Sequence, residues 1–187
     1  MSYYERNLPH WHPEGKSLLV TWRLHGFSPA GIQPRPKDMD SGKVFVAVDR
    51  EIDRGASGPL WLKDPRIAPC VVDTLHFGEK ELKLYELNAY VVMANHVHVL
   101  LCPKVSLAKI TQAIKTFTAR KANEILGRTG QKSWAEESYD HWVRDEKDFQ
   151  KIIAYIERNP VSAGLVEKIE EWPYSSAAWT GKDACPY

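Results

Sequence analysis

Hydrophobic and polar positions alternate in several stretches of the chain, as they do in β-strands. SLLVTWRL, residues 17–24, alternates in this way, and KLYELNAYVVM, residues 83–93, is rich in tyrosine and valine. A short turn at Ala94 and Asn95 then leads into a further β-rich stretch, HVHVLLCP, residues 96–103. We therefore predict three strands, of which the last two are neighbours along the chain.

Two other stretches have the period of a helix. Residues 64–79 begin with an aspartate before Pro65, which suits the first helical position, and have a glycine near their end. Residues 106–126 begin at Ser106, a predicted N-cap, and continue with apolar side chains at helical spacing. These apolar side chains are Leu107, Ile110, Ile114, Phe117 and Ile125.

The last third of the chain adds a further predicted helix. DEKDFQKIIAYIERNP, residues 145–160, is expected to be capped by Asp145 and stopped by Pro160. Before it, residues 139–144 fit either a short strand or an extended arm. After it, residues 171–187 are rich in turn formers and are expected to fold back on the body of the protein.

The order of these elements defines a fold class. A strand, a helix, two strands and two helices predict an α+β fold, with a ferredoxin-like or RRM-like antiparallel sheet and helices packed on one face. Residues 25–42, dense in glycine, proline and aspartate, are a predicted loop, and residues 43–52 fit no single element. We expect a single domain over residues 1–187, with an N-terminal arm and a C-terminal tail.

Composition narrows the class of protein further. The chain has 187 residues, of which 43% are hydrophobic and 26% charged, as in ordinary soluble globular proteins. Its net charge of +1 says nothing about a polyanionic partner, so a nucleic-acid surface would have to come from local clusters of cations. The three cysteines are far apart, and no signal peptide or membrane span is evident, so we expect a cytoplasmic protein with no membrane partner.

His96 and His98 form the first candidate site. Residues two apart on a strand point to the same face, so both imidazoles are expected to project together while Val97 and Val99 face the other way. Neutral imidazole is a common ligand of divalent metal ions. The alternative is a pair of histidines that only pack on a sheet, and a catalytic metal site would still need a third ligand.

Tyr155 and Asn159 form the second candidate. They are four residues apart on the last predicted helix and so share one face. Tyr155 offers a phenol, which becomes a useful nucleophile only when a metal or a base helps to remove its proton. The alternative is a half-buried tyrosine and an asparagine at the end of a helix.

A run of cations follows the predicted sheet. Between Lys104 and Lys132 the only acidic residue is Glu124, a clear asymmetry in a nearly neutral chain. Such a run suits a phosphate backbone, although a solvated helix face would have the same composition. The sequence contains no Walker loop and no GxGxxG, GxSxG or HExxH motif, so nucleotide hydrolysis, dinucleotide binding and zincin chemistry have no support.

Four stretches together resemble one known family. NHVHVLL, residues 95–101, resembles the histidine motif of the HUH single-strand nucleases. The downstream stretches YDHWVRDEKDF, YIERNPVSAGLV and WPYSS resemble those of the REP-associated tyrosine transposases, kin of the transposases of the smallest insertion sequences. Two departures are visible. Ala94 stands where many relatives have proline, which affects the turn, and Asn159 stands where relatives often have the longer glutamine.

The resemblance implies a site and a reaction. His96, His98 and Asn159 would hold Mg²⁺ or Mn²⁺, and Tyr155 would attack a phosphodiester of single-stranded DNA. The implied products are a 5′-phosphotyrosine and a free 3′-OH. A 3′-OH from another strand end can then reverse this step and rejoin the DNA. The implied substrate is a hairpin of the REP type.

The resemblance also leaves alternatives open. The chain is expected to act as a monomer or a homodimer, and to be associated with the nucleoid when it binds DNA. The alternative functions are a non-catalytic, domesticated hairpin-binding protein and a metal-dependent hydrolase of a small molecule. The residues expected to contact DNA are Lys115, Arg120, Lys121 and Arg144.

Overall fold

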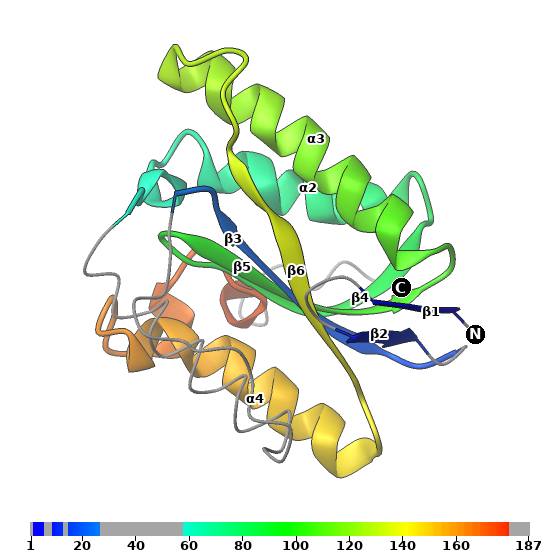
Figure 1. Ribbon diagram of the computed structural model, residues 1–187. Helices are drawn as coiled ribbons and strands as arrows, with labels where there is room; N and C mark the ends of the chain where they lie inside the picture. The colour runs from blue at the N-terminus through cyan, green and yellow to red at the C-terminus, as the bar shows by residue number, and fades with distance from the viewer. Residues whose placement is uncertain (1, 6–8, 13–14, 27–57, 180–187) are drawn as a thin grey trace.

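The computed structural model describes residues 2–5, 9–12, 15–26 and 58–179 (Figure 1). The ambiguous stretch 43–52 and most of the predicted loop 25–42 lie outside the described residues. The described strands are β1 (Ser2–Glu5), β2 (Pro9–His12), β3 (Leu18–Leu24), β4 (Tyr85–Val92), β5 (His96–Pro103) and β6 (Trp134–Trp142). The helices are η1 (Trp61–Lys63), α2 (Ala68–Lys80), α3 (Leu107–Leu126), α4 (Glu146–Ser162), η2 (Ile169–Glu171) and η3 (Ser176–Trp179).

The main sheet has four strands in the order β4-β5-β3-β6, and all of its pairings are antiparallel. The three strands predicted from the alternation pattern are all present. Of the two readings of residues 139–144, the strand is correct, and it is the end of the longer strand β6 at one edge of the sheet. A separate two-stranded ladder joins β1 to β2. The α+β class and the antiparallel sheet are confirmed.

The main hydrophobic core lies between one face of the sheet and the helices α2 and α3. Alternate residues of β3 and β5, among them Trp22, Leu24, Val97 and Val99, enter this core. They meet apolar side chains of α2 and α3, such as Leu75 on α2. The prediction of helices packed on one face is therefore correct for α2 and α3 (Figure 1).

Helix α4 packs on the opposite face of the sheet, which the prediction did not foresee. Its buried side chains Ile152 and Ile156 contact a second cluster that includes Leu19, Val91 and Leu100 from the strands. In Figure 1, α4 lies on one side of the sheet and α2 with α3 on the other. This second layer is possible because β4 and β5 carry apolar residues on both faces, as strands covered on both sides do.

Helix α2 begins later than the sequence predicted. It starts at Ala68 and has Pro69, not Pro65, in its first turn, where a missing N–H leaves no intrahelical bond unmade. Asp64 lies before the first turn of α2 and does not cap it; its carboxylate accepts hydrogen bonds from the Arg66 backbone and guanidinium. These bonds lower the pKa of Asp64 to about 2.

Two further details of the helices differ from the prediction. Phe117, one of the apolar residues at helical spacing, lies on the outer face of α3 and is 43% exposed. Helix α4 continues past Pro160 to Ser162, because a proline in the last turn removes only one backbone donor. The Asp145 cap is confirmed, since its side chain accepts a hydrogen bond from the Asp148 backbone.

The C-terminal tail folds back on the sheet, as predicted, over the part that the structure describes. Trp172 donates its indole N–H to the Val92 carbonyl at 3.0 Å, and Ser175 forms an isolated bridge with Val91. This segment therefore covers one end of β4. Among the described residues no helix is both long and apolar enough to cross a membrane.

Replacing Gly78 with alanine is expected to destabilise the fold. Gly78 is buried in α2, and an added Cβ would collide with the hydroxyl of Tyr85, which donates to the Leu75 carbonyl at 2.7 Å. We expect the free energy of unfolding in urea to fall by about 1–3 kcal/mol, despite alanine's better helix propensity. Phe77→Ala, one position away and exposed, should change it by less than about 0.5 kcal/mol. An unchanged or higher stability for Gly78→Ala would contradict this account.

Candidate metal and nucleophile site

His96 and His98 lie together on the face of β5 that α4 covers. Both side chains are fully buried, and their Nε2 atoms are 2.9 Å apart. The two rings stand nearly perpendicular, with their centroids 4.6 Å apart. Val97 and Val99 enter the core on the other face. The alternation of β5 therefore brings the two imidazoles together as the spacing predicted.

The other nitrogen of each ring is held by a neighbouring side chain. The Nδ1 atom of His96 is 2.7 Å from Oδ1 of Asn95, and an amide oxygen can only accept, so this nitrogen is the donor. The Nδ1 atom of His98 is 2.6 Å from the hydroxyl of Thr21 on β3. Sequence reasoning missed both partners. Asn95 precedes the motif directly and offered a signal, whereas Thr21 is placed by strand pairing alone.

This arrangement fits a divalent metal ion. In histidine metal sites, the ring nitrogen that does not bind the metal is usually held by a hydrogen bond to a neighbouring group. Two nitrogen ligands at a right angle around an octahedral ion, with bonds of about 2.1 Å, lie about 3.0 Å apart. The 2.9 Å separation of the two Nε2 atoms suits that geometry. Thr21 can donate or accept, so its hydroxyl is compatible with the tautomer of His98 that carries the proton on Nδ1 and leaves Nε2 free as a ligand.

Helix α4 brings Tyr155 and Asn159 to the same histidine pair. The Tyr155 ring packs edge-on against the His98 ring, with centroids 5.8 Å apart. Nδ2 of the buried Asn159 is 3.4 Å from Nε2 of His98, and turning the amide about its Cβ–Cγ bond exchanges that nitrogen for the oxygen Oδ1. The shorter asparagine thus reaches the pair.

Among the described residues no histidine, cysteine or acidic side chain joins the pair as a third ligand. Within the described ranges no three histidine, cysteine or acidic side chains are grouped so that they could hold a metal ion. The role of Asn159 as third ligand stays a prediction.

Thr21→Val should weaken metal binding without removing a ligand. Valine keeps the shape of threonine but leaves Nδ1 of His98 without the hydroxyl, so its tautomer and orientation are no longer held. Loss of such an outer partner typically lowers metal affinity by about 10–100-fold. Titration calorimetry with Mn²⁺ should show this shift. Thr111→Val, which removes a hydroxyl bonded within α3, should leave the affinity unchanged. An equal loss in both variants would contradict the role of Thr21.

Lys115, one of the cations expected to contact DNA, is held against β6. Its ammonium donates to the carbonyls of Ala135 and Glu136 and to the hydroxyl of Ser138, at 3.0–3.3 Å. Burial lowers the pKa of Lys115 to about 8. This ammonium therefore anchors the edge strand to α3, and a contact with DNA stays a prediction.

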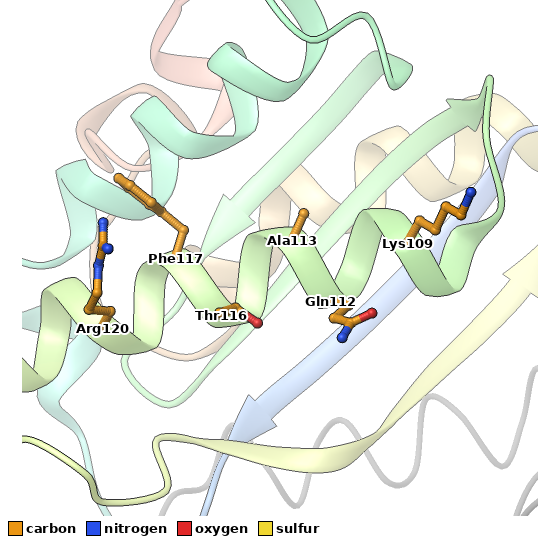
Figure 2. Close-up of a pocket in the computed structure, with 6 residues that line it drawn as sticks. All are labelled: Lys109, Gln112, Ala113, Thr116, Phe117 and Arg120. Atoms are coloured by element: carbon orange, nitrogen blue, oxygen red, sulfur yellow. The ribbon is translucent and has the colours of Figure 1, made fainter.

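Arg120 and Lys121 lie nearer the solvent on α3. Arg120 is exposed, lies 5.5 Å from the centre of the Phe117 ring, and forms a long ion pair with Glu124. Lys121 also pairs with Glu124, at 3.3 Å. Figure 2 shows Phe117 and Arg120 on the same side of α3, in a shallow surface pocket that is also lined by Lys109, Gln112, Ala113 and Thr116. The exposed Phe117 ring and the Arg120 guanidinium together form a surface on which a nucleic acid base could stack beside a bound phosphate.

Arg144, the fourth cation expected to contact DNA, precedes α4. Its side chain is exposed, and its backbone N–H donates to the Asp148 carboxylate at 3.1 Å. It belongs neither to the α3 surface nor to the histidine pair, so its contact with DNA also stays a prediction.

A family model described as "Transposase IS200 like" matches residues 76–159 of the chain. That segment begins in α2 and ends at Asn159, the last residue of the candidate site in α4. It therefore contains both histidines, Tyr155 and Asn159, together with Asn95. Thr21 on β3 lies outside it.

The proteins similar to the chain include two curated proteins and a solved structure. A Haemophilus influenzae protein assigned as a REP-associated tyrosine transposase is 44% identical over 43 residues, which cover 23% of this chain and 24% of that protein. The REP-associated tyrosine transposase of Escherichia coli is 27% identical over 96 residues, which cover 49% of this chain and 54% of that protein. The chain thus spans about half or less of the curated relatives it matches.

The solved structure extends the likeness to nearly the whole fold. A REP-associated tyrosine transposase bound to a REP hairpin superposes with a TM-score of 0.56 at 19% identity. The superposition covers 94% of this chain and 82% of that one. At this identity it supports the arrangement of sheet and helices.

Proposed function

We propose that this chain, a relative of the REP-associated tyrosine transposases as its motifs predicted, is an enzyme that cuts and rejoins single-stranded DNA. Tyr155 is the nucleophile, and His96, His98 and Asn159 are the ligands of a Mg²⁺ or Mn²⁺ ion. The bound ion would supply a Lewis acid that polarises the phosphate and stabilises its developing charge.

One observation carries this proposal, namely the convergence of a chelating histidine pair and a phenol from separate elements. The two Nε2 atoms are 2.9 Å apart, and the Tyr155 ring lies against His98. A protein that only binds a hairpin has no need for a phenol beside two chelating imidazoles. A tyrosine next to a metal site is the arrangement that phosphoryl transfer to a phenol requires.

The proposed reaction moves the phosphate to Tyr155 and back to DNA, as the family resemblance implies. The Tyr155 hydroxyl oxygen gives up its proton to solvent and attacks phosphorus, and the bond between phosphorus and the 3′-oxygen breaks. The leaving 3′-oxygen takes a proton from solvent, and the 5′-phosphate remains joined to Tyr155. A 3′-OH from another strand end attacks this phosphotyrosine and restores the tyrosine. No bond energy is lost from the phosphodiester, so the cycle needs no ATP.

The proposed substrate is a DNA hairpin with an unpaired stretch at its foot. The solved relative is bound to a REP hairpin, and the α3 surface of this chain offers an exposed ring with cations beside it. An unpaired stretch is needed because the scissile phosphate must reach a buried pair of histidines.

The test is incubation of the protein with end-labelled hairpin DNA and Mn²⁺, followed by a denaturing gel and mass spectrometry of the labelled band. We expect a protein–DNA adduct at Tyr155 that forms only with the metal. Binding without any adduct would favour the non-catalytic hairpin-binding protein. Cleavage without an adduct would point to a metal-dependent hydrolase and would exclude the tyrosine mechanism.

A further inference from the structure

Arg23 lies on β3, two residues after Thr21, and is paired with the histidine strand β5. In the pairing of β3 with β5, Thr21 is opposite His98 and Arg23 is opposite His96. Trp22 and Leu24, on either side of Arg23, both enter the core under α2 and α3. The Arg23 side chain therefore points to the other face, the one on which both imidazoles lie.

The guanidinium of Arg23 is partly buried and incompletely bonded. Among the described residues its Nε atom is buried and has no hydrogen-bond partner. Burial lowers the pKa of Arg23, and the negative charge of Glu137 on the edge strand acts in the opposite direction. An arginine nevertheless stays charged in a protein, so a positive charge lies at this face of the sheet.

A buried cationic donor needs an anionic acceptor. Native proteins leave few buried polar atoms unpaired, and those that remain call for an explanation such as a ligand. The guanidinium is a planar fork whose donors match two oxygens of a phosphate. Side chains directly opposite on paired strands have Cβ atoms about 4.5–5.5 Å apart, so the long Arg23 side chain reaches the space beside His96.

We propose that Arg23 binds the non-bridging oxygens of the phosphate that Tyr155 attacks. Three elements then surround one phosphate, with the histidine pair on β5, the nucleophile on α4 and the guanidinium on β3. Charge that develops on the phosphate oxygens in the transition state is stabilised by a fixed cation that needs no rearrangement. This role rests on the proposed function, because it assigns Arg23 to the same reaction.

The first experiment combines a substitution of Arg23 with a modification of the scissile phosphate. Arg23→Gln is compared with the wild type on a normal hairpin and on hairpins that carry a methylphosphonate of either configuration at the scissile position. We expect adduct formation on the normal hairpin to slow by about 10²–10³-fold, as for loss of one oxyanion-binding donor. On either methylphosphonate, in which a methyl group replaces one of the two oxygens that the fork binds, the substitution should slow the reaction further by less than about 3-fold, because the two-point contact is already lost.

Two further variants complete this experiment. Arg23→Lys keeps the charge but not the fork, and should fall between the wild type and Arg23→Gln. Arg66→Gln changes an exposed arginine that binds Asp64 on another part of the fold, and should react like the wild type. An equal slowing of Arg23→Gln on all substrates would assign Arg23 a structural role and overturn the proposal.

A second measurement does not depend on catalysis, metal or a folded variant. The Nε–H signal of Arg23 in the ¹⁵N spectrum of the wild type is followed during titration with inorganic phosphate. A saturable shift of this signal, with the Arg66 signal unchanged, supports the phosphate site. An Arg23 signal that stays in place overturns it. If the wild type forms no DNA adduct but Arg23 still binds phosphate, the proposed function fails and the phosphate site stands.

Discussion

Tyr155→Phe is expected to abolish the covalent protein–DNA adduct while leaving hairpin binding intact. The substitution removes only the hydroxyl, so the edge-on contact of the ring with His98 and its packing beside Ile152 and Ile156 remain. The free energy of unfolding should therefore change by less than about 1 kcal/mol. Without a phenol oxygen no phosphotyrosine can form, and removal of a nucleophile typically lowers turnover by about 10⁴–10⁶-fold.

Tyr139 provides the matched control for this experiment. It lies opposite Thr21 in the pairing of β3 with β6, and it packs at the edge of the same cluster as Tyr155. It is thus a second phenol on the histidine face of the sheet. Tyr139→Phe should keep adduct formation and hairpin binding near the wild-type level. If the Tyr139 variant loses the adduct and the Tyr155 variant keeps it, the nucleophile lies on β6 and not on α4.

His96→Ala is expected to remove metal-dependent cleavage almost completely. The imidazole is fully buried, and its loss removes one of two nitrogen ligands and leaves the Asn95 oxygen without its donor. We expect the cleavage rate to fall by at least about 10³-fold, which corresponds to about 4 kcal/mol of lost transition-state stabilisation. The free energy of unfolding should fall by about 1–3 kcal/mol, because a fully buried side chain is truncated and its hydrogen bond to Asn95 is lost.

Metal binding can be followed separately from activity in the same variant. An ion that binds only the folded state raises its stability by an amount set by concentration and affinity. Mn²⁺ should therefore raise the melting temperature of the wild type but not that of His96→Ala. His76→Ala removes a half-buried imidazole from α2, on the other side of the sheet, and should keep the Mn²⁺ effect. A Mn²⁺ effect that persists in His96→Ala would remove that residue from the metal site.

Mixing the two inactive variants tests whether one chain supplies the whole site. Tyr155 contacts His98 of its own chain, so the nucleophile and the ligands are expected to work within one molecule. An equimolar mixture of Tyr155→Phe and His96→Ala should then remain inactive on hairpin DNA. Recovery of adduct formation in the mixture would mean that the tyrosine of one chain serves the histidines of another.

The strands and the main spacings of the site were predictable because they depend on local periodicity. Alternation along a strand is enough to place His96 and His98 on one face, and four residues along a helix are enough to align Tyr155 with Asn159. The start of α2 was less predictable. Asp64 before a proline is a common N-cap pattern, and its carboxylate does accept from the Arg66 backbone N–H and guanidinium. It forms only a turn there, and the regular helix begins at Ala68, which the local pattern does not show.

The face covered by α4 could not be read from its own amphipathic pattern. Buried residues such as Ile152 and Ile156 show that one side of α4 is covered, but an apolar stripe does not say which face of a sheet it meets. A clue was present in β4 and β5, where consecutive apolar residues replace strict alternation, as in strands buried on both faces. That pattern calls for helices on both sides.

The sequence alone was sufficient to predict which chemical groups are paired, because both members of each pair lie close together on one element. The two imidazoles lie two residues apart on β5, and the phenol and the amide lie four residues apart on α4. The meeting of these pairs, and the placement of Thr21 and Arg23 opposite the histidines, came from the folded sheet. Contacts between residues more than fifty positions apart depend on strand order and on the face that a helix covers. Those are properties of the packed core, which no local pattern encodes.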